Sequence, residues 1–471
     1  MESKKLLFKD NSILMDTSAF HFDLKDIIAH THKYHQKVAE TEYRYLRLQE
    51  KWNLNRSKLK ARTQWPVELM QEWQLEKVSN MVDYAFNCIP FYKKLYGQCG
   101  FTTGDIINWD NFNELPHISK KDIIKNFPEQ VILPGVNYEN CYQARTSGST
   151  GVPMTIVRDS VSTESWMMNR MRQFEQMTGE SIQTTDWIYN IYLSTWAFNS
   201  FAGDYPVFSI SENCPPIAVA EHLKLLRPKI ISAFPSFLRR LQPYIQDLSK
   251  YGVKCICTNS ESSTRKERDV FQAHFGVPVL DEYASEELSI IATECPHGNY
   301  HVVEDRVRVD VINQDQNGFG DILGTDMSNT YMPLIRYSQG DLIQWTGEAK
   351  PCACGSKFRY IKRFLGRADQ TLESKERGRI PADLMMNLCD RTLVPIESGL
   401  AEFRICQTNL NTLKLLAVLR KEESEITPTV LARFRKSVYD LFGYKITIQI
   451  EYYAEIPKLS SYKRRMIINE I

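Results

Sequence analysis

The sequence has almost no net charge, no long apolar run and few glycines. Its 58 Lys and Arg residues against 57 Asp and Glu leave a formal charge of +1, so no overall field favours nucleic acid or an anionic membrane as a partner. No stretch approaches the roughly 20 apolar residues that a membrane-spanning helix needs. The basic start MESKKLLFKDNSILMD also lacks an apolar core of signal-peptide length. We therefore expect a cytoplasmic protein that binds neither nucleic acid nor membrane.

The cysteine content and the expected size of the core further restrict the class of protein. Eleven cysteines occur in a chain of 471 residues without an expected secretion signal, which favours free thiols and metal ligands over disulfides. With 43% hydrophobic residues, the chain can bury a large core and should divide into two or more domains.

The pattern of apolar residues predicts three regions. Residues 1–65 are typical of one or two amphipathic helices with a polar face. In the middle of the chain, short β-branched segments alternate with helical ones, which predicts α/β layering. After about residue 365 the pattern changes to that of a small α+β domain on a hinge. Its expected strands are 402–408, 413–420 and 445–453, and its expected helix is 428–442.

A run of six small residues, TSGSTG at 146–151, stands between two segments that read as strands. Taken alone, such a run is more often a flexible turn. Its backbone N–H groups could instead converge on phosphate oxygens, with the hydroxyl groups donating as well. Val152 and Pro153 follow the second glycine, where a Walker loop has lysine, so a P-loop kinase or GTPase is not expected.

Cysteine and histidine cluster in two short segments. ECPHGNYH supplies Cys295, His297 and His301, and PCACG supplies Cys352 and Cys354 about fifty residues later. Thiolate and imidazole groups with short spacing inside each half and a long gap between the halves are typical of a closed tetrahedral zinc site. The alternative is five unrelated residues, but the tight CxC knuckle before a glycine favours the metal.

Five segments occur in an order that carries a family resemblance. RTSGSTGVP, DEYASEE, PLIRYSQGDL, GRADQ and IPKLSSYKRR resemble the successive signatures of the adenylate-forming enzymes, the acyl- and aryl-CoA ligases. Flanking text such as CIPFYKKLYGQCGF and LPHISKKDIIKNFPE is similar to the phenylacetate–CoA ligase branch, with its capsule-biosynthesis-type and deazaflavin-adenylating relatives. The resemblance runs from about residue 65 to the C-terminus.

The resemblance implies a fold, a domain plan and a reaction. The fold would be α/β: a helical extension at 1–65, a large multi-layer adenylate-forming domain at 66–368, and a small mobile α+β domain at 369–471. The enzyme would use ATP and Mg²⁺ to convert a carboxylic acid to acyl-AMP and pass the acyl group to CoA. Open alternatives are a carrier-protein thiol or an amine as acceptor, adenylation of a hydroxyl group, and a nucleotide-binding module without ligase activity. A homodimer is also left open.

The resemblance assigns roles to individual residues. Lys463 would bridge the carboxylate and the α-phosphate, Glu287 would hold Mg²⁺, and Asp369 would be the hinge. Asp341 would accept both ribose hydroxyl protons; its alternative is an aspartate that caps a turn. Ala284 and Glu286 depart from the usual glycine and hydroxyl residue, which leaves open whether Glu286 or Glu287 binds the metal. The implied nucleotide-binding residues are Thr146, Ser147, Gly148, Ser149, Thr150, Gly151, Ser260, Glu261, Glu282, Tyr283, Glu286 and Asp341.

The same resemblance implies two further sites. The branch uses the histidine of a His-Val pair as metal ligand, which selects Cys295, His301, Cys352 and Cys354 for a structural zinc and leaves His297 in reserve. Aromatic residues are dense where related enzymes line the acid pocket, and they would suit an aryl or other planar acid, although aromatics at this density are more often core. The pocket residues selected are Trp187, Tyr189, Tyr192, Phe234 and Ser236.

Overall fold

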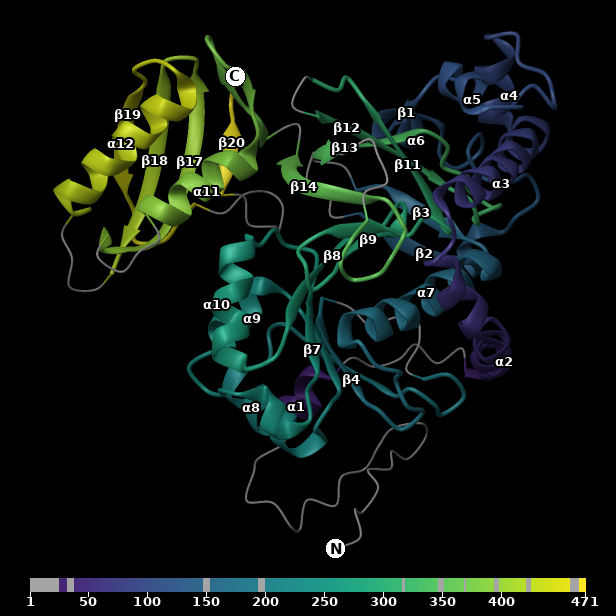
Figure 1. The fold of residues 1–471 in the computed structure, drawn as a ribbon, viewed down its shortest axis with the longest axis horizontal. Helices are drawn as coiled ribbons and strands as arrows, with labels where there is room; N and C mark the ends of the chain where they lie inside the picture. The colour runs from purple at the N-terminus through teal and green to yellow at the C-terminus, as the bar shows by residue number, and fades with distance from the viewer. Residues whose placement is uncertain are drawn as a thin grey trace, which may run out of the picture. The chain divides into compact units, whose positions relative to one another are not determined.

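The chain forms two compact units, each assembled from segments that are separate in the sequence. Figure 1 labels the helices and strands of the chain. The computed structural model describes residues 25–31, 38–146, 153–193, 200–315, 318–345, 351–367, 370–393, 398–420, 425–457 and 466–471, with the backbone alone for 38–46 and 390. The first unit takes its described residues from Met1–Gln49, Ile182–Thr258 and Asp269–Val279. The second takes them from Glu50–Ser181, Asn259–Arg268 and Leu280–Ile471.

The first unit is built on a parallel sheet with the strand order β7–β6–β4–β5. Its strands are β4 (Ile188–Tyr192), β5 (Val207–Ser211), β6 (Ile230–Ala233) and β7 (Cys255–Thr258). The helices are α1 (Lys25–His30), α8 (Pro216–Leu226), α9 (Pro235–Leu241) and, in part, α10 (Arg265–Phe275). β6 and β7 are buried along their whole length, as parallel strands covered on both faces are.

The second unit begins with helices and a hairpin. The helices are the part of α2 (Val38–Arg62) from Glu50 onward, α3 (Val67–Cys88), α4 (Pro90–Gly97), α5 (Trp109–Glu114), α6 (Lys120–Asn126) and α7 (Ser160–Thr178). Between α6 and α7 stand β2 (Tyr142–Arg145) and β3 (Thr155–Arg158), which pair with each other. α7 begins where the Asp159 side chain accepts a hydrogen bond from the Ser162 backbone N–H, and it ends at Gly179, whose φ of +71° suits glycine.

The second unit contributes mainly antiparallel strands, which carry the predicted site residues. Their order is β11–β12–β13–β14–β10–β9–β8, and β1 adds to β13 in parallel. The strands are β1 (Ile118–Ser119), β8 (Val279–Ser285), β9 (Ser289–Glu294), β10 (Tyr300–Val302), β11 (Val307–Ile312), β12 (Phe319–Asp326), β13 (Tyr337–Trp345) and β14 (Tyr360–Arg367). Asp341 on β13 lies directly opposite Arg367 on β14.

The C-terminal region has a sheet and a core of its own. Its elements are β15 (Leu372–Ser374), β16 (Gly378–Ile380), α11 (Ala382–Thr392), β17 (Leu400–Asn409), β18 (Thr412–Leu419), α12 (Pro428–Phe442), β19 (Thr447–Tyr452) and β20 (Ile467–Asn469). The sheet order is β19–β18–β17–β20. Along α12, Val430, Phe434, Val438 and Phe442 are buried at a spacing of four, so one face of the helix packs onto the sheet.

The predicted α/β fold is confirmed. The expected helix at 428–442 is observed, and the expected strands at 402–408, 413–420 and 445–453 correspond to β17, β18 and β19. The boundaries after residues 65 and 368 stay predictions, as does the mobility of the C-terminal domain. Within the described part of the chain, no helix is both long and apolar enough to cross a membrane.

Candidate nucleotide and metal sites

The glycine-rich run is flanked by a hairpin, as its neighbouring segments predict. β2 and β3 pair from Tyr142 opposite Arg158 to Arg145 opposite Thr155. Thr146 extends the pairing, because its N–H donates to the Met154 carbonyl and its hydroxyl accepts from the Met154 N–H, both at 2.9 Å. The other predicted phosphate-loop residues, Ser147, Gly148, Ser149, Thr150 and Gly151, lie outside the described residues. Lys463 and Asp369 lie outside them too.

Strands β8, β13 and β14 bring Tyr283 to the carboxylate of Asp341. The Tyr283 hydroxyl donates to Asp341 Oδ2 at 2.6 Å, and Gln339 Nε2 donates to the same hydroxyl at 3.1 Å. Arg367 Nη1 lies 3.5 Å from Asp341 Oδ1 and donates to the Gln339 carbonyl at 2.6 Å. Gly340, between Gln339 and Asp341 in the sequence, has φ +77°, and a Cβ there would stand 3.2 Å from Arg367 Nη2. This backbone position therefore requires glycine.

Glu287 belongs to the same group of side chains. Its Oε1 accepts a hydrogen bond of 3.1 Å from the hydroxyl of Tyr337 at the start of β13. Burial, followed by the negative charges of neighbouring carboxylates, raises the pKa of Tyr283 and Tyr337 well above the ordinary value. Both phenols therefore stay neutral donors, and the Asp341 and Glu287 carboxylates each keep one fixed hydrogen-bond partner.

Other predicted nucleotide residues have different surroundings. Glu282 is buried, where it pairs with Arg170 and accepts from Gln173 Nε2 at 2.6 Å; both partners stand on α7, so this carboxylate holds the helix to the sheet. Ser260 has φ +63°, an uncommon conformation for a residue with a side chain. The Glu261 N–H donates to the Asn259 carbonyl at 2.8 Å, which makes this segment a tight turn.

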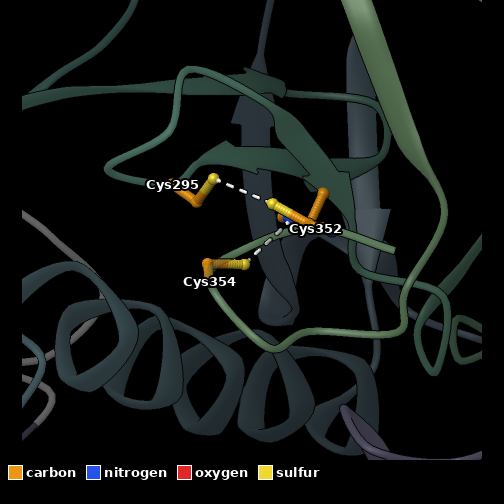
Figure 2. A group of neighbouring side chains, drawn as sticks. Cys295, Cys352 and Cys354 are labelled. Atoms are coloured by element: carbon orange, nitrogen blue, oxygen red, sulfur yellow. Dashed lines mark hydrogen bonds between the residues drawn. The ribbon is translucent and has the colours of Figure 1, made fainter. Parts of the chain in front are cut away.

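The four selected cysteine and histidine residues come together. The Sγ atoms of Cys295, Cys352 and Cys354 and a ring nitrogen of His301 all lie within 4.8 Å of one another. Figure 2 shows the three cysteines, with Cys295 Sγ 3.7 Å from Cys352 Sγ. Cys354 Sγ is 3.2 Å from His301 Nε2. Three thiols and one imidazole are a donor set that zinc prefers, and a tetrahedron of protein atoms leaves no open position.

The surroundings of this cluster orient its ligands. His301 Nδ1 lies 2.7 Å from the Phe358 carbonyl, which leaves Nε2 facing the thiols. Burial alone would raise the pKa of Cys352, but hydrogen bonds from the Cys354 backbone N–H and the Asn299 side chain lower it to about 6. The Cys352 thiol therefore ionises near neutral pH, and the thiolate is the form that binds metal.

A buried ionic network starts beside the cluster. Glu294, which precedes Cys295, lies 2.9 Å from Arg265 Nη1 and 3.0 Å from Arg268 Nη2. Its Oε2 also accepts from the Asp281 N–H at 2.9 Å. Tyr300, next to His301, donates to Asp281 Oδ2 at 2.9 Å. Asp281 opens the DEYASEE segment, so the network joins the cysteine and histidine cluster to the strand that carries Tyr283.

Phe364 on β14 completes this link through ring contacts. Its ring centroid lies 4.2 Å from that of Tyr283 and 4.6 Å from that of Tyr300. The Cys352–Cys354 knuckle precedes β14, and Arg367 ends it. The position of β14 therefore affects the metal cluster and the Asp341 group together.

The predicted acid-pocket residues lie in the first unit. Tyr192 and Phe234 stack with ring centroids 5.2 Å apart and an interplanar angle of 30°, while Trp187 and Ser236 are half-buried. Tyr189 differs from the expectation, because it is 0% exposed and its hydroxyl lies 3.0 Å from His222 Nδ1. It stands on β4 between two neighbouring strands and is a core residue.

The chain is similar to several known proteins, although no family model matches it. It is 23% identical over 422 residues to Protein CapK of Staphylococcus aureus, covering 85% of this chain and 89% of that protein. It is 23% identical over 336 residues to phenylacetate-coenzyme A ligase of Thermus thermophilus, covering 65% and 72%. The structure of 2-hydroxyisobutyryl-CoA ligase with 2-HIB-AMP, in the postadenylation state, aligns with a TM-score of 0.67 at 18% identity, covering 86% and 90%.

The fold is thus that of the adenylate-forming ligases, with a large N-terminal domain and a small C-terminal domain. Homologues of this chain include Protein CapK and phenylacetate–CoA ligases. The predicted resemblance is confirmed at the level of homology and fold.

Several residues of the Asp341 group were not singled out from the sequence. Tyr337, Gln339 and Arg367 lie inside the quoted PLIRYSQGDL and GRADQ segments, and the register of β13 against β14 would have shown that Arg367 meets Asp341. No motif or strand register in the sequence singles out Arg158. It is buried and donates to the Glu286 backbone carbonyl at 2.5 Å, a contact between positions 128 residues apart.

Proposed function

We propose that this chain is an ATP-dependent acid–thiol ligase. A carboxylate oxygen of the acid attacks the α-phosphorus of ATP, pyrophosphate leaves, and acyl-AMP forms. The thiol of CoA then attacks the acyl carbon, loses its proton and displaces AMP. The observation that carries this proposal is the convergence of Tyr283, Asp341 and Arg367 from three strands with Glu287 from the turn between β8 and β9, in a chain whose relatives include CoA ligases.

In this proposal Asp341 holds the ribose of ATP. Its carboxylate accepts from Tyr283 on one oxygen, and Arg367 lies near the other. An aspartate oriented in this way can accept hydrogen bonds from ribose hydroxyl groups. The ring of Tyr283 would stack on the adenine base, while Ser260 and Glu261 in the tight turn would pack against the same base.

We assign Mg²⁺ to Glu287 rather than to Glu286. The Glu287 carboxylate is oriented by Tyr337, next to the Asp341 group, and Mg²⁺ prefers carboxylate and phosphate oxygens. Magnesium would offset the negative charge of the triphosphate as pyrophosphate departs. Glu286 would act through its backbone, and Glu282 is assigned to the ion pair with Arg170.

The remaining assignments rest on the resemblance. Residues Thr146 to Gly151 would bind the phosphates, Lys463 would bridge acid and α-phosphate, and Asp369 would let the small domain move between the two steps. Trp187, Tyr192, Phe234 and Ser236 would line the pocket for an aryl or other planar acid. We leave out Tyr189 because its side chain is fully buried. A carrier-protein thiol is the alternative acceptor, and the site of action would be the cytoplasm.

We also propose a structural zinc at Cys295, His301, Cys352 and Cys354. The donor set and the convergence of its ligand atoms within 4.8 Å fit this metal. Zinc would supply folding free energy by joining the β9–β10 turn to the segment before β14. No step of the reaction is assigned to it.

The complete reaction tests the proposal. Purified protein with ATP and Mg²⁺ should release AMP only when both an acid and CoA are present, and mass spectrometry should detect the matching thioester. A panel should include phenylacetate, benzoates, 2-hydroxyisobutyrate and aliphatic acids. AMP release that needs an acid and an added carrier protein or amine, but not CoA, would identify that compound as the acceptor. ATP binding without AMP release from any acid would support a nucleotide-binding module instead.

A further inference from the structure

Two buried arginines hold the backbone on both sides of Glu287. Arg158, at the end of β3, donates through Nη2 to the Glu286 carbonyl at 2.5 Å. Arg306 donates through Nη1 to the Leu288 carbonyl. The two arginines are only 4% and 1% exposed, so both guanidinium groups lie in the protein interior. Glu287 is thus the residue between two carbonyl groups fixed by cations.

The rest of this segment is equally constrained. The Leu288 N–H donates to Ser285 Oγ at 3.0 Å, and the Leu288 side chain is fully buried. It packs so closely on Gly324 that a Cβ at that position would lie 1.9 Å from Leu288 Cδ1. Ser289 follows with φ +58°, a conformation that the surroundings must impose. Backbone movement at Glu287 is therefore restricted from both directions.

Charge distinguishes the two arginines. Arg306 pairs with Asp326 at 3.2 Å. Arg158 has no acidic partner among the residues that the structure describes, and its buried Nη1 makes no hydrogen bond to any of them. Burying an unpaired cation is costly. Filling space or donating to one carbonyl does not require a buried positive charge. The charge therefore points to a negatively charged ligand near the segment that Arg158 holds.

We propose that Arg158 is a positioning residue for magnesium-dependent nucleotide binding. It joins the hairpin that carries the glycine-rich run to the backbone of Glu287, and its charge favours the triphosphate complex. The inference rests on the proposed function, in which Glu287 would hold the Mg²⁺ that offsets the negative charge of the triphosphate. AMP has no triphosphate, so Arg158 should matter for MgATP and hardly at all for AMP.

The test compares nucleotide affinities of Arg158→Gln, Arg158→Lys and the unmodified chain by calorimetry. ATP is titrated with Mg²⁺ and with EDTA, and AMP is titrated separately. Mg²⁺ should increase the ATP affinity of Arg158→Gln about tenfold less than it increases that of the unmodified chain, as expected for loss of one charge-assisted contact. The affinity for AMP should change by less than about twofold. Arg158→Lys keeps the charge but cannot span the same contacts, and should lie between.

Arg172→Gln is the matched control. Arg172 is another buried arginine, bound to both Asp305 oxygens at 2.7 Å and to the Leu59 carbonyl at 2.9 Å. Its loss should lower the melting temperature but leave the Mg²⁺-dependent gain unchanged. Equal losses for ATP and AMP in the Arg158 variants, or an unchanged Mg²⁺ gain, would overturn the inference. If Arg158→Gln does not fold, Arg158→Lys carries the test.

The controls separate this inference from the function beneath it. If the unmodified chain binds neither ATP nor AMP, the proposed function fails and the inference fails with it. If the unmodified chain binds MgATP more tightly than ATP in EDTA and Arg158→Gln does the same, only the role of Arg158 is wrong.

Discussion

Replacing Lys463 by alanine is expected to slow acyl-AMP formation by about two orders of magnitude or more, which is roughly 3 kcal/mol of transition-state stabilisation. Adenylation brings a carboxylate against an anionic triphosphate, and one ammonium group between them is worth far more in a water-poor site than in bulk solvent. Lys463 stands six residues after Pro457 in IPKLSSYKRR, the position at which the adenylate-forming enzymes that this segment resembles have this lysine. Single-turnover measurement of acyl-AMP is the readout.

The second half-reaction separates a catalytic lysine from a damaged domain. Lys463→Ala should still consume chemically supplied acyl-AMP in the presence of CoA. Asp369→Pro should do the reverse, forming acyl-AMP but losing transfer, because proline fixes a torsion that the hinge must change. Lys458→Ala in the same segment is the control and should lose neither step. An intact first step in Lys463→Ala, or equal loss of both steps in both variants, would mean that lysine and hinge are wrongly assigned.

Removing two metal ligands should have the largest effect on stability. We expect about one zinc ion per chain in the unmodified protein, as proposed above, and its loss from Cys352→Ser/Cys354→Ser. The free energy of unfolding should fall by about 4 kcal/mol or more, a size typical of lost metal sites. Elemental analysis and thermal melting measure the two effects. The variant should also bind ATP more weakly, because Phe364 on β14 contacts both Tyr283 and Tyr300.

A matched pair of thiols controls for the loss of cysteine itself. Cys88 is half-buried and Cys99 is exposed, so Cys88→Ser/Cys99→Ser removes two thiols outside the cluster. That variant should keep its zinc and its melting temperature. Retention of a full complement of zinc by Cys352→Ser/Cys354→Ser would show that the metal ligands lie elsewhere.

The sequence predicted those parts of the fold where local pattern and tertiary environment agree. α12 was predicted to the residue because apolar side chains recur every four positions between Pro428 and the terminating Gly443. The cysteine and histidine ligands could be grouped because their chemistry is rare and their spacing short. Tyr189 could not be separated from its aromatic neighbours, because an aromatic side chain on a buried strand looks the same in a core and in a pocket.

Long-range contacts explain why the other features of the structure were not predicted from the sequence. Glu282 stands within a segment with a family signature, and only its contact with Arg170 on α7 shows that it is an internal ion pair. Arg158 and Arg306 meet the backbone around Glu287 from distant positions, and one arginine in a strand pattern gives no sign of its partner. The interleaving of two compact units along the chain is likewise set by packing and has no local signal.

Acid-dependent exchange of pyrophosphate into ATP tests the central claim most directly, because it reports acyl-AMP formation without any acceptor. The assay uses the full chain, Mg²⁺, labelled pyrophosphate and a panel of aryl and aliphatic acids, with Glu287→Gln as the matched variant. We predict exchange with at least one planar acid, none without acid, and at least about a hundredfold less in Glu287→Gln. Folded protein that binds ATP but shows no exchange with any acid of the panel would contradict the assignment as an adenylate-forming ligase.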